Sequence, residues 1–143
     1  TDGKEINPII IKSNNNTSNP SDFKQMKGFN QDAIDLIKKG IFKAVNDPKG
    51  TAFLSRLNSK KVMCGKTATS QVRRISMQER ETGIIKNEEL PLEQRDHALF
   101  VGYYPYNNPK YAFSIVVEHG GSGSKSAAPI AKNICNKLEK SFL

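Results

Sequence analysis

The chain has 143 residues, a length that suits one domain, of which 36% are hydrophobic and 25% charged. This composition supplies a core and excludes a globally disordered chain. The net charge of +8 leaves open a basic, non-catalytic module that binds an anionic polymer such as nucleic acid, although the lysines are scattered. No stretch approaches the ~20 apolar residues of a membrane helix, and no signal-peptide pattern begins the sequence.

The cysteines and histidines give no support for a metal centre or a disulfide framework. Cys64 and Cys135 lie among apolar neighbours, where a free cysteine packs as a small core residue. A single disulfide bridge between Cys64 and Cys135 remains an alternative. His97 and His119 lie far apart in the sequence and show no metal-ligand spacing. We therefore expect no metal and no cofactor.

The first part of the chain predicts a short strand, a loop and a helix. Residues 7–11 (NPIII) are strand-like, and residues 12–22 are rich in turn formers. Asn30 is a suitable N-cap for a helix that ends at residues 46–50, where proline and glycine resist continuation. The apolar residues of this helix recur on one face: Ile34, Ile37, Ile41, Ala44 and Val45.

The middle of the chain predicts an antiparallel sheet. One or two helical turns at 51–57 precede a strand within 60–72, and a long charged connection covers 73–96. Residues 97–106 and 110–120 form a predicted hairpin around an Asn-Asn-Pro turn. The side chains on both faces of the second hairpin strand are largely apolar, which predicts that both faces are covered.

A last helix begins near Ser126 and tolerates Pro129 in its first turn, where backbone donors have no intrahelical acceptors. Its apolar face is predicted to carry Ile130, Ile134 and Leu138. The predicted fold class is α/β of the α+β type, an antiparallel sheet flanked by helices.

The segment GKTAT, residues 65–69, carries the chemistry. Lys66 offers a positive charge, and the hydroxyls of Thr67 and Thr69 offer donors for a carboxylate. Backbone N–H groups at an exposed strand edge can polarise a carbonyl. Strict alternation places Lys66 on the opposite side from the threonines, so one ligand meets all three only beside an edge strand. The alternative is a structural strand with surface lysine and threonine.

The longer pattern resembles a known family. GKTATSQV (65–72) and the passage 96–134 are similar to the C-terminal part of the transpeptidase domain of class B penicillin-binding proteins of the elongation type, the group called penicillin-binding protein 2. The matching elements are the Lys-Thr-Gly-like box on a strand, the DHA-FVG--PY-NP hairpin and the VVE-GG-G---AAPIA passage. NDPKGTA (46–52) also fits, and the resemblance covers about residues 29–143.

The resemblance implies serine acyl transfer. A serine attacks the D-Ala-D-Ala bond of a peptidoglycan stem peptide, and the acyl group then passes to an amine of a neighbouring stem; β-lactams trap that serine. By analogy with the family, the resemblance implies that Lys66 supplies positive potential and that the hydroxyls of Thr67 and Thr69 bind the substrate carboxylate. The Thr69 N–H supplies half of an oxyanion hole. Ala68 replaces the family's glycine in this substrate-binding box, and we expect its methyl group to slow acylation.

The resemblance also implies that the nucleophile lies elsewhere. The strings at 13–15 (SNN), 21–24 (SDFK) and 122–125 (SGSK) match the spacing of the family's serine boxes, but in the wrong order or place, so we interpret all three as loop. We expect a C-terminal fragment that is inactive alone, exposes apolar surface and self-associates. The parent would be anchored in the inner membrane, with this domain in the periplasm, and would contact membrane proteins of an elongation complex.

Overall fold

The computed structural model describes residues 3–5, 24, 27–28 and 30–140. The chain divides into two compact units, Thr1–Lys39 and Gly40–Leu143. In the first unit, the backbone N–H of Glu5 donates to the carbonyl of Lys24 at 2.9 Å. The strand and the polar loop predicted at 7–22 lie outside the described residues.

The first helix, α1 (Gln31–Asn46), begins where the sequence predicts. The side-chain oxygen of Asn30 accepts a hydrogen bond from a first-turn N–H at 2.7 Å, which confirms the N-cap. Ile34 and Val45 are buried, but Ile37 is 56% exposed. The predicted apolar face is therefore only partly covered by the described residues.

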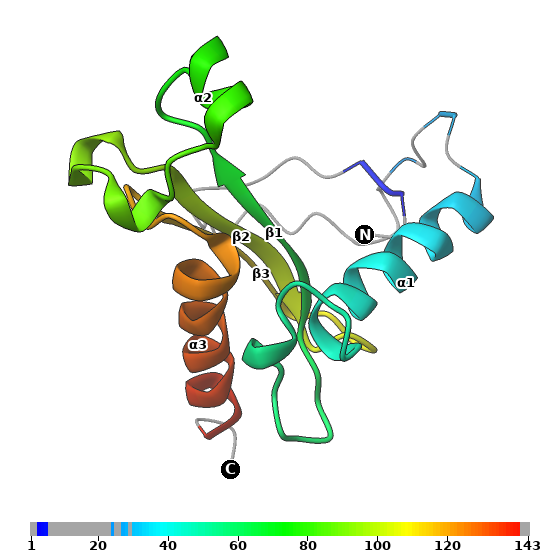
Figure 1. The fold of residues 1–143 in the computed structure, drawn as a ribbon. Coiled ribbons are helices and arrows are strands. Elements are labelled where there is room, and N and C mark those ends of the chain that lie inside the picture. The colour runs from blue at the N-terminus through cyan, green and yellow to red at the C-terminus, as the bar shows by residue number, and fades with distance from the viewer. Residues whose placement is uncertain (1–2, 6–23, 25–26, 29, 141–143) are drawn as a thin grey trace, which may run out of the picture. The chain divides into compact units, whose positions relative to one another are not determined.

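In the described part of the chain, three antiparallel strands form the sheet: β1 (Cys64–Ser70), β2 (His97–Tyr104) and β3 (Tyr111–Val117), in the order β1-β2-β3. The predicted hairpin is confirmed as β2 and β3. Among the described residues, β1 forms one edge of this sheet and pairs only with β2 (Figure 1). The position of β1 at an edge decides which of its backbone groups a ligand can reach.

The helix α3 (Ala128–Lys140) packs against β2 and β3, and a π-helical segment, Gly123–Ala127, leads into it. The buried residues of α3 are Ala128, Ala131 and Cys135, whereas Ile130 and Ile134 are 40% and 39% exposed. The predicted apolar face is thus wrong for these two isoleucines. Small side chains on the buried stripe let the helix axis approach the sheet, so burial does not follow side-chain size here.

The core lies between α3, its flanking segments and one face of the sheet. Its largest fully buried side chains are Phe100, Met63, Val45 and Cys135. Both cysteines are free, and burial, with a smaller contribution from Cys64, raises the pKa of the Cys135 thiol to about 11. At neutral pH Cys135 is therefore an unreactive core thiol.

The other face of the sheet is open at its middle over the described residues, whereas Cys64 at one end of that face is buried. Val101 and Val116 are 50% and 56% exposed there, so the prediction that both faces of β3 are covered is wrong within the described part of the chain. Apolar alternation identifies side chains that suit burial, but it does not identify the segment that covers them.

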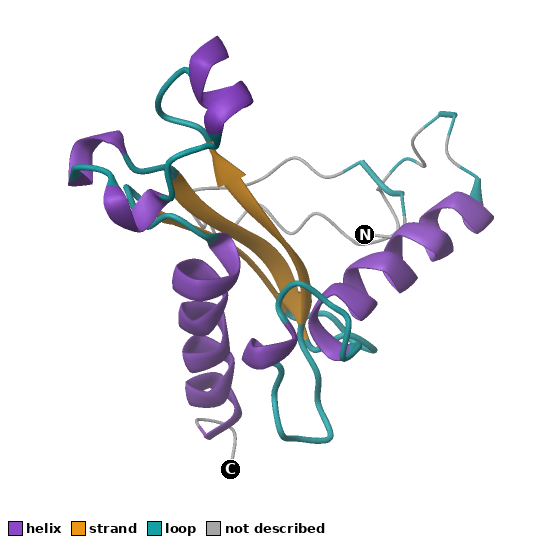
Figure 2. Cartoon of the chain, in the orientation of Figure 1, coloured by secondary structure: helices purple, strands orange, loops and turns teal. Residues whose placement is uncertain are grey.

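The connection between β1 and β2 is more regular than the sequence predicts. It contains the short helix α2 (Met77–Thr82) and two 3₁₀ turns, Asn87–Glu89 and Leu92–Gln94 (Figure 2). Ser76 caps α2 through a capping box with Glu79. None of the helices in the described residues has the length and apolarity that crossing a membrane requires.

Candidate active site at the edge of the sheet

The two faces of β1 carry different chemistry. Thr67 and Thr69 lie opposite Phe100 and Ala98 of β2, two fully buried residues, so both threonines belong to the face of the sheet that α3 covers. Thr69 is exposed and Thr67 is half-buried. At this edge position the hydroxyls lie beside a strand margin that no described strand occupies.

Lys66 and Ala68 belong to the open face. Both are exposed, and Lys66 lies opposite Val101 in the register. The Lys66 ammonium donates to the carbonyl oxygen of Thr67 at 2.7 Å, which keeps its charge beside the strand. The methyl group of Ala68 therefore points to the same side as the Lys66 charge, away from the hydroxyl of Thr67.

Thr51 is a site residue that the sequence reasoning missed. Its hydroxyl lies 3.0 Å from the hydroxyl of Thr67, within hydrogen-bonding distance. Thr51 belongs to the passage 46–52, whose likeness to the family was the available signal. This contact can orient the Thr67 hydroxyl, because either hydroxyl can donate to the other and the hydrogen bond restricts the rotation of both.

Gly123 brings the start of the π-helical segment into contact with the backbone of β1. A Cβ atom at this position would lie 2.5 Å from the carbonyl oxygen of Ala68 and 2.4 Å from that of Leu99. Only glycine fits such an approach. The segment before α3 therefore packs directly against the strand that carries Lys66, Thr67 and Thr69.

The end of β1 is fixed by Asp96. One carboxylate oxygen of Asp96 accepts from the N–H of Val72 at 3.2 Å, and the Asp96 carbonyl accepts from the N–H of Gly121 at 2.8 Å. These bonds connect the end of the strand with the start of β2 and with the approach to α3. They stabilise the geometry of the edge from a position outside the Lys-Thr-Ala-Thr box.

Arg73 and Glu79 form an ion pair just beyond β1. The guanidinium lies 2.7 Å from one carboxylate oxygen and donates to the other at 2.9 Å. These bonds, with the backbone N–H of Ser76, lower the pKa of Glu79 to about 2. Arg73 is thus paired with α2, which leaves its charge less available for a ligand at the edge.

The Ser-x-x-Lys string at 122–125 does not form a nucleophile site. The Ser122 hydroxyl lies 2.9 Å from the hydroxyl of Ser124, and the Lys125 ammonium pairs with Glu88 at 3.3 Å. A nucleophilic serine needs a base within hydrogen-bonding reach, and Lys125 contacts a carboxylate instead. The strings at 13–15 and 21–24 lie outside the described residues, apart from Lys24. Over the described part of the chain, no cluster of three His, Cys, Asp or Glu side chains could bind a metal ion.

An edge strand with a Lys-Thr-Ala-Thr box, a hairpin and a C-terminal helix packed on one sheet face is the arrangement of a penicillin-binding transpeptidase domain. The family described as penicillin binding protein transpeptidase domain matches residues 1–136, and the chain belongs to this family. The peptidoglycan D,D-transpeptidase MrdA of Haemophilus influenzae is 34% identical over 102 residues, 71% of this chain and 15% of that protein. MrdA of Salmonella typhimurium is 33% identical over 72% of this chain and 16% of that protein.

Comparison with solved structures supports the same family. The chain is similar to penicillin-binding protein 2 in its complex with MreC from Helicobacter pylori, with a TM-score of 0.67 and 30% identity over 90% of this chain and 21% of that one. Pseudomonas aeruginosa PBP2 in complex with WCK 5153 gives a TM-score of 0.53 and 33% identity, over 73% of this chain and 19% of that one. The fold class and the family resemblance read from the sequence are therefore confirmed. The chain spans about a sixth of the length of the MrdA relatives.

Proposed function

We propose that the complete protein that carries this chain is a serine-type peptidoglycan D,D-transpeptidase of cell-wall elongation. The relatives named MrdA support the reaction class. The observation that carries the proposal is the free margin of β1, where Lys66, Thr67 and Thr69 border a strip that no described strand occupies. A stem peptide can run along this margin and present its carboxylate to the hydroxyls.

Each residue of the box has a proposed role. Lys66 supplies positive potential, which has a catalytic role because it stabilises the negative charge that develops in the transition state. The hydroxyls of Thr67 and Thr69 donate to the terminal carboxylate of the D-Ala-D-Ala unit. The Thr69 N–H contributes half of the oxyanion hole, and Ala68 lines the same substrate-binding strip. We place the serine nucleophile outside this chain, so the chain alone forms no acyl-enzyme.

The proposed function also implies a cellular compartment and binding partners. We propose that this domain lies in the periplasm of a protein anchored in the inner membrane, because its substrate is peptidoglycan. β-Lactams are the expected inhibitors, since they resemble the D-Ala-D-Ala end and acylate the serine. We propose contact with membrane proteins of an elongation complex, and the complex of Helicobacter pylori PBP2 with MreC supports contact with another protein. We also propose that the isolated chain self-associates through the open face around Val101 and Val116, because both apolar side chains are exposed there.

Labelling with a fluorescent penicillin tests the proposal. The complete protein should be labelled covalently, and the 143-residue chain should not. Lys66→Ala in the complete protein should reduce the labelling rate about 100-fold, the scale of losing one main electrostatic contact in a transition state. Lys43→Ala removes an exposed lysine of α1 and should leave the rate unchanged.

Two results would count against the transpeptidase. One is equal labelling rates for both lysine variants. The other is no labelling at all, together with oligonucleotide binding that weakens steeply with salt, since such binding is the mark of a basic polymer-binding module.

A further inference from the structure

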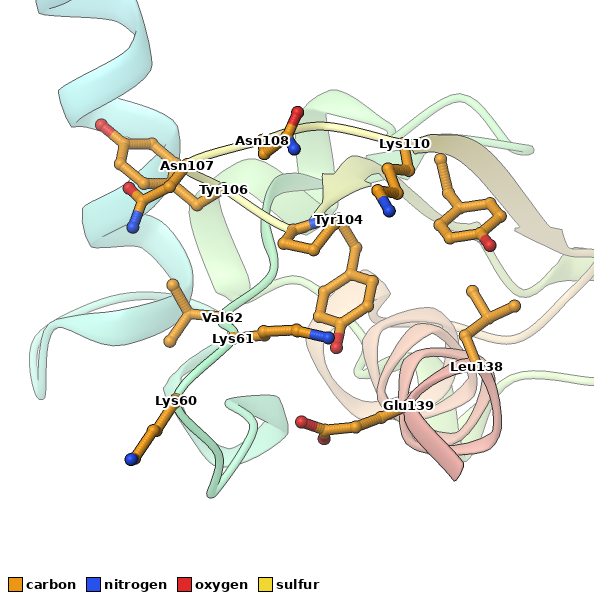
Figure 3. Close-up of a pocket in the computed structure, with 12 residues that line it drawn as sticks. Lys60, Lys61, Val62, Tyr104, Tyr106, Asn107, Asn108, Lys110, Leu138 and Glu139 are labelled. Atoms are coloured by element: carbon orange, nitrogen blue, oxygen red, sulfur yellow. The ribbon is translucent and has the colours of Figure 1, made fainter. Parts of the chain in front are cut away.

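A pocket opens where β2 enters the hairpin turn. It has a volume of about 300 Å³, and Figure 3 shows its lining residues. Its apolar walls come from β2, β3, α3 and the segment before β1: Val62, Tyr104, Tyr111 and Leu138. This size is at the lower end of the range for pockets that bind small molecules. None of the residues assigned to the β1 margin lines it.

Backbone hydrogen bonds fix the rim of this pocket. The N–H of Tyr106 donates to the carbonyl of Val62 at 2.9 Å, which joins the hairpin turn to the segment before β1. The N–H of Lys110 donates to the carbonyl of Tyr104 at 3.0 Å and closes the turn. The walls are therefore formed before any ligand binds, which lowers the entropic cost of binding.

The pocket is positively charged. Lys61 and Lys110 extend their ammonium groups toward the hollow from two sides, whereas Lys60 points away from it (Figure 3). Neither Lys61 nor Lys110 has an ion-pair partner among the described residues. Glu139 is the one carboxylate in the lining, and it belongs to α3. Two unpaired cations facing a partly apolar hollow favour an anion that also carries apolar surface.

Tyr104 is the unsatisfied polar group of this pocket. The side chain is 3% exposed, and its hydroxyl has no hydrogen-bond partner among the described residues. Figure 3 shows its hydroxyl end on the side of Lys61 and Glu139. Burial first, and the charge of Glu139 second, raise the pKa of this hydroxyl, so it remains a donor at neutral pH. A buried donor without an acceptor costs free energy, which an oxygen of a ligand would recover.

We propose that this pocket binds a small organic anion that joins a flat ring to a phosphate or carboxylate group. The ring packs against Tyr104, Tyr111 and Val62. The anionic group lies between Lys61 and Lys110 and accepts a hydrogen bond from the Tyr104 hydroxyl at the inner wall. The site is separate from the β1 margin, and it does not depend on the proposed transpeptidase activity.

Isothermal titration calorimetry of the complete protein at low ionic strength tests this site with phenyl phosphate, benzoate and inorganic phosphate as probes. We expect a dissociation constant of about 1 mM or lower for at least one ring-bearing probe. The better of phenyl phosphate and benzoate identifies the anionic group. Inorganic phosphate should bind at least tenfold more weakly than phenyl phosphate, because it lacks the ring.

Variants localise the binding. Lys61→Ala and Lys110→Ala should each weaken it about fivefold, and Lys49→Ala should leave it unchanged. Glu139→Gln should strengthen it, because this change removes the one negative charge of the lining. Tyr104→Phe should weaken binding about fivefold while the melting temperature without a probe stays the same or rises, since the change removes an unsatisfied buried donor. A purely structural tyrosine would not give that combination.

The melting temperature of each lysine variant should equal that of the parent protein, which shows that the variants are folded. The proposal is overturned if neither ring-bearing probe binds, if inorganic phosphate binds as tightly as phenyl phosphate, or if the Lys61, Lys110 and Lys49 variants behave alike.

Discussion

Asn87 and Asp96 bind each other through two reciprocal hydrogen bonds. The side-chain amide of Asn87 donates to one Asp96 carboxylate oxygen at 3.1 Å, and the backbone N–H of Asp96 donates to the Asn87 side-chain oxygen at 2.9 Å. The other carboxylate oxygen accepts from Val72. Asp96 thereby connects the 3₁₀ turn at Asn87–Glu89 with both strands at the end of the β1–β2 pair.

Asp96→Ala should loosen this end of the sheet. The change removes two acceptors of a charged group, so we expect a loss of about 2 kcal/mol in the free energy of unfolding, measured by urea denaturation. The Val72 amide should lose its protection from hydrogen exchange. Glu93→Gln, at an exposed position of the same connection, is the control and should change neither quantity. An unchanged Val72 amide in Asp96→Ala would contradict the assigned role.

Gly123→Ala should displace the backbone of β1. The added methyl group would overlap the carbonyl oxygens of Ala68 and Leu99, and relief of that overlap requires a backbone shift. Overpacking of this kind costs roughly 1–3 kcal/mol, and the penicillin labelling rate of the complete protein should fall with it. Gly40→Ala is the matched control: its Cβ meets nothing within 4 Å on α1, so it should be neutral or stabilising. Equal stability of the two variants would show that the close approach is unimportant.

Ala68→Gly should speed acylation by a β-lactam. The Ala68 methyl group lies on the face that also carries Lys66, and its removal restores the glycine that the family resemblance implies at this position. We expect the acylation rate of the complete protein to rise about tenfold, which corresponds to about 1.4 kcal/mol of relieved crowding. Ala112→Gly makes the same chemical change at an exposed position of β3 and should not raise the rate. Equal rates before and after the Ala68 change would end this explanation.

Thr51→Val should impair the Thr67 hydroxyl without touching the box. The variant keeps the shape of Thr51 but loses the 3.0 Å contact between the two hydroxyls. We expect the acylation rate to fall about fivefold, the scale of one hydrogen bond of about 1 kcal/mol. Thr51→Ser should retain most of the rate. Thr82→Val removes a hydroxyl of α2 that donates to its own helix, and an equal drop there would point to a general loss of stability.

Acid should weaken the attachment of α2. The folded-state pKa of Glu79 is about 2, below the ordinary value of 4.5. The pairing of this carboxylate with Arg73 is therefore fully present above pH 4.5 and is lost as the pH falls toward 2. The Gly83 N–H, which donates to the Glu79 carbonyl, should lose exchange protection over that range. Glu79→Gln should show weak protection already at neutral pH, and Glu81→Gln should behave like the parent. A pH-independent Gly83 amide would refute the assignment.

Local sequence signals determined much of this fold. The N-cap at Asn30, the proline and glycine after α1, and the hairpin turn act over a few residues, so their sequence patterns predict the element boundaries well. The capping box that begins α2 is equally local, but it lies inside a segment read as a loop. The GKTAT box is likewise a local signal, because a cation and two hydroxyls on one strand are chemically distinctive.

Tertiary structure alone decided which of these residues meet. The edge position of β1, the contact between Thr51 and Thr67 across 16 residues, and the approach of Gly123 to Ala68 all depend on packing between distant segments. The unsatisfied Tyr104 hydroxyl likewise results from four chain segments that converge on one pocket. Short-range propensities fix backbone angles, whereas burial and register depend on which surfaces come together, and that information is distributed over the whole chain.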